Sequence, residues 1–210
     1  QIVPFLGAVE LPGEEAHNIM VPQERLRITK SLNFDEVKPR SAGVMMLFYP
    51  KVGRTHLVLI VRNSYEGVHS SQIAFPGGKY EKEDLNLEQT ALRETYEEIG
   101  VKPENIEVIK AFTQLYIPPS NFMVHPFLGI CYEEIIFYPD SKEVASIIEL
   151  PFSTFLSESI VVSATMSTSY AKSIDVPVFK IDEHVVWGAT AMMLSELKMV
   201  LNSALNKCNF

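Results

Sequence analysis

Residues 75–79 (FPGGK) and residues 93–101 (RETYEEIGV) decide how this chain folds, with a polar, acidic connector between them. The Pro-Gly-Gly triplet cannot continue a helix or a central strand, so it predicts a tight turn whose backbone carbonyls can face a ligand. Apolar residues at helical spacing begin after Asn86, and Gly100 is a suitable C-cap for that helix. We therefore expect a glycine turn followed by one amphipathic helix.

Glu94, Glu97 and Glu98 recur at i, i+3 and i+4 in this helix, on the face opposite its apolar side. Carboxylates this close oppose one another by about 3 kcal/mol per pair at roughly 5 Å and an effective dielectric of about 20. A bound divalent cation relieves this repulsion most simply, and carboxylate and carbonyl oxygens suit Mg²⁺ or Mn²⁺ rather than zinc. The alternative is a solvated acidic helix face, which is common among Glu-rich helices.

The glycine turn and the glutamate helix together resemble the Nudix box, whose pattern is G-x5-E-x7-R-E-U-x-E-E-x-G-U with U a bulky apolar residue. The matching positions are Gly78, Arg93, Glu94, Glu97, Glu98, Gly100 and Val101. Thr95 stands at the first U position, and the acidic residue after the glycine is Asp84, separated from Arg93 by eight residues instead of seven. The extra residue falls at the loop-to-helix entry, where an insertion costs least.

The resemblance implies a metal-dependent hydrolase and assigns roles to the helix and the turn. Glu97 and Glu98, with the backbone carbonyl of Gly77 or Gly78, are the implied ligands of Mg²⁺ or Mn²⁺. Glu94 is either a further ligand or the base that orients the attacking water. Such a site would neutralise a diphosphate and align water with one phosphorus atom.

Charged residues outside the glutamate triad are further candidates. Arg93 is expected to pair with Asp84 or Glu94 and to hold the carboxylates in position, an ordinary surface arginine being the alternative. Glu143 lies at a Glu-Val landmark that resembles the family pattern, and is a candidate for a later ligand or base. A solvated loop charge is the other interpretation of Glu143.

Substrate phosphates need cationic or hydrogen-bonding partners, and three residues border the expected cleft. Arg62 and Lys79 are the candidates for holding phosphates, with exposed charge as the alternative. His69 could contact a phosphate or serve as a structural cap for its loop.

The segment ahead of the glycine turn narrows the resemblance to one subfamily. Residues 57–63 (LVLIVRN) and 69–78 (HSSQIAFPGG) resemble the signature of coenzyme A diphosphatases, L-T-x-R-S followed by H-x-G-Q-I-x-F-P-G-G. This implies cleavage of coenzyme A or its thioesters to 3′,5′-ADP and the 4′-phosphopantetheine moiety. An arginine usual in that signature is replaced around residues 67–68, and Ser71 stands where a glycine is usual. A Nudix hydrolase of another substrate such as ADP-ribose, and a non-catalytic Nudix-fold binding module, are the alternatives.

Composition limits the remaining possibilities. The chain has 210 residues, 47% of them hydrophobic, which predicts one Nudix domain over residues 41–210 behind an N-terminal extension, residues 1–40, with a short helix around 23–32. The net charge of −8 argues against nucleic-acid binding, and no apolar run is long enough to span a bilayer. Two cysteines without metal spacing suit a reducing compartment, so we expect a cytoplasmic protein. The expected partners are a small nucleotide-derived substrate and, through the N-terminal arm, a second copy in a homodimer.

The pattern of apolar runs predicts the fold class. Strands are expected over residues 42–49, 56–62, 106–116, 122–132, 145–150, 161–167 and 176–181. A second long helix is expected over residues 190–206. Strands with a helix on either side predict an α+β fold, an α/β/α sandwich with a mixed sheet of the Nudix type.

Overall fold

The computed structural model describes residues 2–21, 37–63, 72–166 and 173–208. The chain divides into two compact units, one of residues 39–154 and the other of residues 1–38 together with 155–210. The expected helix around residues 23–32 lies outside the described residues. In the described part of the chain, no helix combines the length and the apolar character that crossing a membrane requires.

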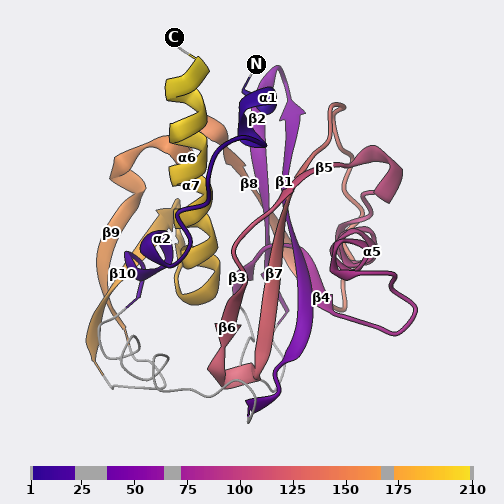
Figure 1. The fold of residues 1–210 in the computed structure, drawn as a ribbon, viewed down its shortest axis with the longest axis horizontal. Helices are drawn as coiled ribbons and strands as arrows, with labels where there is room; N and C mark the ends of the chain where they lie inside the picture. The colour runs from indigo at the N-terminus through magenta and orange to yellow at the C-terminus, as the bar shows by residue number, and fades with distance from the viewer. Residues whose placement is uncertain (1, 22–36, 64–71, 167–172, 209–210) are drawn as a thin grey trace. The chain divides into compact units, whose positions relative to one another are not determined.

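The unit of residues 39–154 is built around one mixed sheet (Figure 1). Its strands are β1 (Arg40–Lys51), β2 (Arg54–Arg62), β3 (Ile73–Ala74), β4 (Gly77–Lys79), β5 (Glu107–Ala111), β6 (Leu115–Ile117), β7 (Phe122–Ile130) and β8 (Val144–Pro151). The central strand β1 runs parallel to β7 and antiparallel to β2 and β4. The α+β class and the mixed sheet predicted from the sequence are confirmed.

Strand β1 shares one of its edges between two partners, and this places the glycine turn. Residues 42–44 of β1 pair with β4, whereas residues 48–51 pair with β2. Strand β2 pairs along its other edge with β8 and reaches β3 at its end. The turn predicted at the Pro-Gly-Gly triplet therefore leads into a short strand of the sheet itself, which lies beside β1.

That helix, α5 (Leu87–Ile99), begins and ends where the sequence predicts. The Asn86 side chain accepts a hydrogen bond from the amide of Gln89 at 2.9 Å, which satisfies one free donor of the first turn. Gly100 ends the helix with φ of +78°, and its amide donates to the carbonyl of Tyr96 at 2.8 Å. Local capping chemistry thus fixes both ends of the element that carries the glutamates.

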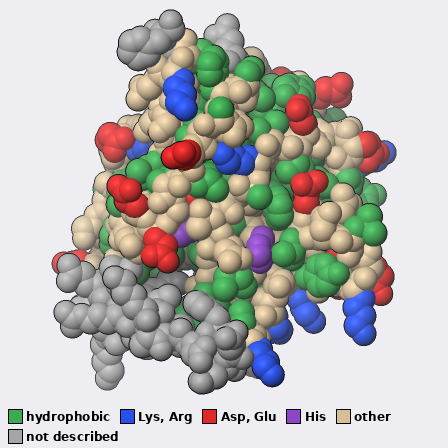
Figure 2. Space-filling view, viewed as in Figure 1, with side chains coloured by type: hydrophobic (Ala, Val, Ile, Leu, Met, Phe, Trp, Pro, Cys, Tyr) green, Lys and Arg blue, Asp and Glu red, His purple; other side chains and the backbone are tan. Residues whose placement is uncertain are grey.

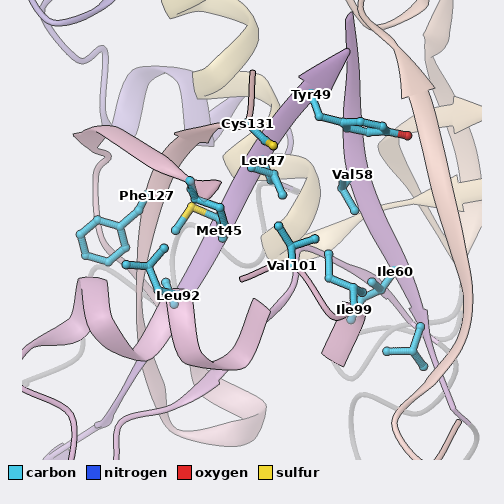
Figure 3. Packing of buried hydrophobic residues seen from close by; sticks show 13 residues of the cluster. Met45, Leu47, Tyr49, Val58, Ile60, Leu92, Ile99, Val101, Phe127 and Cys131 are labelled. Carbon is cyan, nitrogen blue, oxygen red and sulfur yellow. The ribbon is translucent and has the colours of Figure 1, made fainter. Parts of the chain in front are cut away.

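Apolar side chains from the sheet and from α5 meet in one core (Figure 3). Its buried members include Met45, Leu47, Tyr49, Val58, Ile60, Leu92, Ile99, Val101, Phe127 and Cys131. Burying a side chain of this kind stabilises the fold by about 1.5–3 kcal/mol. The core holds α5 against β1, so the apolar side of the helix fixes the position of its polar side.

Some of the other segments of this unit form short helical turns. They are η1 (Pro103–Asn105), η2 (Pro118–Ser120) and α6 (Phe152–Leu156), the last at the boundary of the unit. The strand expected over residues 106–116 is two strands, β5 and β6, and both pair with β7. Between them the amide of Phe112 donates to the carbonyl of Pro126 at 2.8 Å.

The unit of residues 1–38 and 155–210 has its own sheet and helices. Its elements are α1 (Val3–Leu6), α2 (Glu14–Asn18), η3 (Glu158–Ile160), β9 (Val161–Met166), β10 (Ile174–Ile181), β11 (His184–Val186) and α7 (Gly188–Cys208). Strand β10 is central and antiparallel to both neighbours. Glu196 of α7 is fully buried and binds the amide of Gly13 at 3.1 Å and His17 at 3.2 Å, which ties α2 to α7.

Candidate active site

Glu94 and Glu98 of α5 lie against β4, but the three predicted glutamates do not share one environment. The side chain of Glu97 is 55% exposed, that of Glu94 14%, and that of Glu98 only 1%. The expectation that all three lie on a face opposite the apolar side is wrong for Glu98. This carboxylate is buried because β4 and the end of β2 cover it.

Arg93 binds three of the acidic side chains at once. Its Nε and Nη2 donate to the two carboxylate oxygens of Asp84 at 2.9 and 3.0 Å. Its Nη1 donates to Glu94 at 3.0 Å and to Glu97 at 2.9 Å, and Nη2 also reaches the backbone carbonyl of Lys79 at 3.1 Å. Arg93 therefore pairs with both residues that the sequence analysis named as its alternatives, Asp84 and Glu94. The hydrogen bonds with Asp84 are the main reason that the pKa of Arg93 is raised.

Asp84 anchors this network from the loop ahead of the helix. Its carboxylate also accepts the amide of Glu81 at 3.0 Å and the hydroxyl of Thr90 at 2.8 Å. The hydrogen bond from Arg93 is the largest cause that holds the pKa of Asp84 well below its ordinary range. Sequence reasoning missed Thr90, whose signal is a polar residue three positions before Arg93 on the buried side of the helix.

Glu98 has a separate set of partners. Its Oε2 accepts the amide of Gly77 at 2.8 Å, and its Oε1 accepts Nη1 of Arg62 at 3.2 Å. Burial raises the pKa of Glu98 to about 7, although Arg62 and the Gly77 amide act in the opposite direction. A buried carboxylate with one cation and one amide is poised to gain from a further positive charge.

The two glycines of β4 lie directly against these carboxylates. A Cβ on Gly78 would stand 2.3–2.5 Å from the carboxylate of Glu94, so any side chain there would displace that carboxylate from its position. Gly77 has φ of +153° and faces Val44 across the antiparallel pairing with β1. Its amide donates to Glu98 instead of β1, so by the alternation of an antiparallel ladder its carbonyl also faces away from β1.

Glu143 reaches the site from the loop ahead of β8. Its Oε2 lies 4.0 Å from Nη2 of Arg62. The loop is tied to the end of α5, because the amides of Tyr138 and Asp140 donate to the carbonyls of Ile99 and Glu98, both at 3.0 Å. The structure thus brings Glu143 beside the carboxylate cluster, which its sequence position alone does not show.

The structure says little about the substrate-binding roles predicted for Lys79 and His69. Lys79 follows the glycines on β4; its side chain is exposed, and its backbone carbonyl serves Arg93. His69 lies outside the described residues. Their predicted roles stay predictions.

The donor set of this site fits a hard divalent cation. It offers carboxylate oxygens and one backbone carbonyl, and burial is the main cause that raises the pKa of Glu94 as well as Glu98. Among the described residues, no three acidic, histidine or cysteine side chains converge closely enough to hold a metal ion. In this arrangement Arg93 binds Glu94 and Glu97, and Arg62 binds Glu98.

Comparison with known proteins agrees with this geometry. The family model described as "NUDIX domain" matches residues 37–161. The "Uncharacterized Nudix hydrolase NudL" of Citrobacter koseri is 31% identical over 177 residues, covering 80% of this chain and 86% of that protein. The protein of the same name from Pectobacterium atrosepticum is 30% identical over 156 residues, covering 70% and 77%. The crystal structure of the Nudix hydrolase RenU from M. smegmatis has the same fold, with a TM-score of 0.54 and 14% identity over 79% of this chain and 87% of that one. The chain therefore belongs to the Nudix family and is a Nudix diphosphatase that acts on a small nucleotide-derived substrate.

Proposed function

We propose that the protein hydrolyses the diphosphate bond of coenzyme A or its thioesters, with Mg²⁺ or Mn²⁺ as cofactor. The products would be 3′,5′-ADP and 4′-phosphopantetheine or its acyl form. The observation that carries the hydrolytic part is that Arg93 binds Asp84, Glu94 and Glu97 together while Glu98 rests on the amide of Gly77. Acidic oxygens are thus gathered beside a backbone turn that a diphosphate can approach.

The proposed metal ligands are Glu94, Glu97 and Glu98, together with a backbone carbonyl. The carbonyl of Gly77 suits this role better than that of Gly78, since Gly77 already turns its amide toward Glu98 and away from β1. A bound divalent cation would neutralise the charge on the diphosphate oxygens and lower the pKa of the attacking water.

The chain's own residues supply position and charge around that group. Asp84 orients Arg93, and Arg93 fixes the side chains of Glu94 and Glu97. Glu94 remains either a ligand or the group that orients the attacking water, and Glu143 is a second candidate base. Because Glu94 is largely buried, a proton that it accepts would be shielded from bulk solvent.

Selectivity for coenzyme A is supported by the signature of residues 69–78. In its described part, Ile73 and Ala74 form β3 beside β2, and Phe75 is buried with 1% exposure, so this segment delivers the glycine turn to β1. Lys79 and His69 are the proposed phosphate partners. Arg62 shares that proposed role, and its buried Nε has no hydrogen-bond partner within the described residues.

The direct test is product identification. The purified protein is incubated with coenzyme A, acetyl-coenzyme A, ADP-ribose and a dinucleoside polyphosphate, each with Mg²⁺ and with Mn²⁺, and products are identified by mass. We expect 3′,5′-ADP from both coenzyme A substrates and none with chelator or with the Glu98→Gln variant. ADP-ribose is the second candidate substrate, because residues 67–68 lack the arginine usual in coenzyme A diphosphatases.

The organisation of the whole chain is also a proposal. We propose that residues 41–210 work as one Nudix hydrolase domain and that residues 1–40 form an extension that supports a homodimer. We further propose that the protein works in the cytoplasm, where its nucleotide-derived substrates occur. Acidic side chains are spread over the face shown in Figure 2, in keeping with the net charge of −8 and with a small-molecule substrate. Light scattering of the wild type over a range of protein concentrations would test the dimer.

A further inference from the structure

We infer that Arg62 is a positioning residue for Glu98, which it holds against the glycine turn and links to the loop of Glu143. This rests on the proposed function only for its effect on turnover. The contact itself belongs to the chain and can be tested without substrate or metal.

Glu98 depends on Arg62 because the carboxylate is removed from solvent. Its side chain is 1% exposed, and its two oxygens are divided between the Gly77 amide and Arg62. Within the described residues, Arg62 is the cation in ion-pair distance of Glu98, whereas Arg93 serves the other acidic side chains. A buried carboxylate that loses its single cationic partner is strongly disfavoured in that place and is expected to move away from the Gly77 amide.

The backbone aims Arg62 at this carboxylate. Arg62 is the last residue of β2, and the pairing of β2 with β8 shifts register between Val61 and Arg62. Such an irregularity beside a functional site turns a side chain away from the direction that strand alternation would give it. The amide of Arg62 donates to the carbonyl of Gln72 at 3.0 Å, which fixes its backbone next to the segment leading into the glycine turn.

The same arginine connects Glu98 to the loop that carries Glu143. Arg62 Nη2 lies 4.0 Å from Glu143, and the next residue, Asn63, donates its amide to the carbonyl of Glu143 at 2.9 Å. The side-chain amide of Asn63 also donates to the carbonyl of Ser141. The end of β2 therefore joins two elements that both contribute acidic groups, the last turn of α5 and the loop of residues 138–143.

A phosphate-binding role and a positioning role predict different kinetic effects. If Arg62 served only the substrate, its loss would raise KM and leave the metal-free site unchanged. If it positions Glu98, its loss lowers kcat by about 10–100-fold, the usual range for residues that orient metal ligands, with KM changed by less than about threefold. Arg54 is exposed at the other end of β2, so Arg54→Gln is the control variant that removes one positive charge away from Glu98.

The decisive experiment follows single amides in the metal-free protein by hydrogen exchange and NMR. In Arg62→Gln we expect the Gly77 amide, bound to Glu98, to exchange at least about tenfold faster than in the wild type. The Met45 amide, which donates to the carbonyl of Pro76 at 2.8 Å in the same turn, should keep its protection. Arg54→Gln should alter neither amide, and Arg62→Lys should restore part of the Gly77 protection because it keeps the charge without the fork geometry.

Several outcomes would overturn the inference. These are unchanged exchange at Gly77, equal loss of protection at Gly77 and Met45, or a rise in KM alone. If Arg62→Gln does not fold, the neutral, similarly long Arg62→Met decides: protection at Gly77 equal to the wild type contradicts the positioning role, and selective loss at Gly77 supports it. A wild type that cleaves no diphosphate would remove the proposed function, while the exchange result would still decide the role of Arg62.

Discussion

The guanidinium of Arg93 donates to both carboxylate oxygens of Asp84, at 2.9 and 3.0 Å, and so links the loop ahead of α5 to the helix itself. Arg93 also donates hydrogen bonds to Glu94 and Glu97. The position of these two proposed metal ligands therefore depends on Asp84, which lies outside the helix. Asp84 has only 8% of its surface exposed, which makes this pair stronger than an ordinary surface ion pair.

Replacing Asp84 by Asn should destabilise the fold by about 1.5–3 kcal/mol at neutral pH, the usual cost of a lost hydrogen bond to a charged group. The pKa of Asp84 is lowered in the folded protein, mainly by Arg93. Its contribution is therefore complete above the unfolded pKa of about 3.9 and is lost as the pH falls below it. Urea unfolding of the wild type and Asp84→Asn from neutral pH to about pH 2.5 measures the gap, which should narrow on acidification. The neighbouring exposed Glu83→Gln is the control, and a gap that does not depend on pH would contradict the pairing.

Replacing Glu97 by Gln should lower kcat by about 10³-fold or more with the fold intact, because the change removes a charged oxygen from the proposed metal site. Glu97 is 55% exposed, so its loss leaves no buried cavity or unpaired core charge. Turnover is measured with Mg²⁺ at saturating substrate, with circular dichroism to confirm folding. Glu88→Gln, in the first turn of the same helix, should keep normal activity. Near wild-type turnover in Glu97→Gln would remove Glu97 from the site.

The sequence predicts those features of the site that are determined by residues close together in the chain. The start of the helix after Asn86, the cap at Gly100 and the i, i+3, i+4 spacing of the glutamates depend on neighbouring residues, and the structure agrees with all of them. The burial of Glu98 was mispredicted because its helical spacing was overlooked: it lies seven residues after Ala91 and three after Thr95, which are both on the buried side of α5.

Contacts between distant segments explain the remaining differences. The predicted phosphate role of Arg62 stays a prediction, and its hydrogen bond with Glu98 could not be predicted because the two residues are 36 positions apart in the sequence. Thr90 was missed because its hydrogen bond to Asp84, at 2.8 Å, depends on how the loop ahead of α5 folds back onto the helix. The two-strand division of residues 106–116 likewise depends on pairing with β7.

Metal binding should stabilise the fold. Burial raises the pKa of both Glu94 and Glu98, so ionising them costs free energy that a cation bound only to the folded state would offset. Mg²⁺ or Mn²⁺ at about 100 times its Kd should add about 2.7 kcal/mol to the free energy of unfolding. The measurement is Tm as a function of metal concentration, with Glu97→Gln as the variant that should respond less. A Tm that ignores both metals at millimolar concentration would count against a preformed site.

The comparison that tests the proposed activity most directly is the initial rate on coenzyme A against that on ADP-ribose, with the same metal and pH. Coenzyme A carries a 3′-phosphate that ADP-ribose lacks, and a charge-assisted contact to it would be worth about 1.5–3 kcal/mol, or roughly ten- to a hundred-fold. We predict that kcat/KM for coenzyme A exceeds that for ADP-ribose by at least about tenfold, with 3′,5′-ADP as the product. Equal or faster cleavage of ADP-ribose would contradict the coenzyme A assignment and leave the Nudix diphosphatase itself in place.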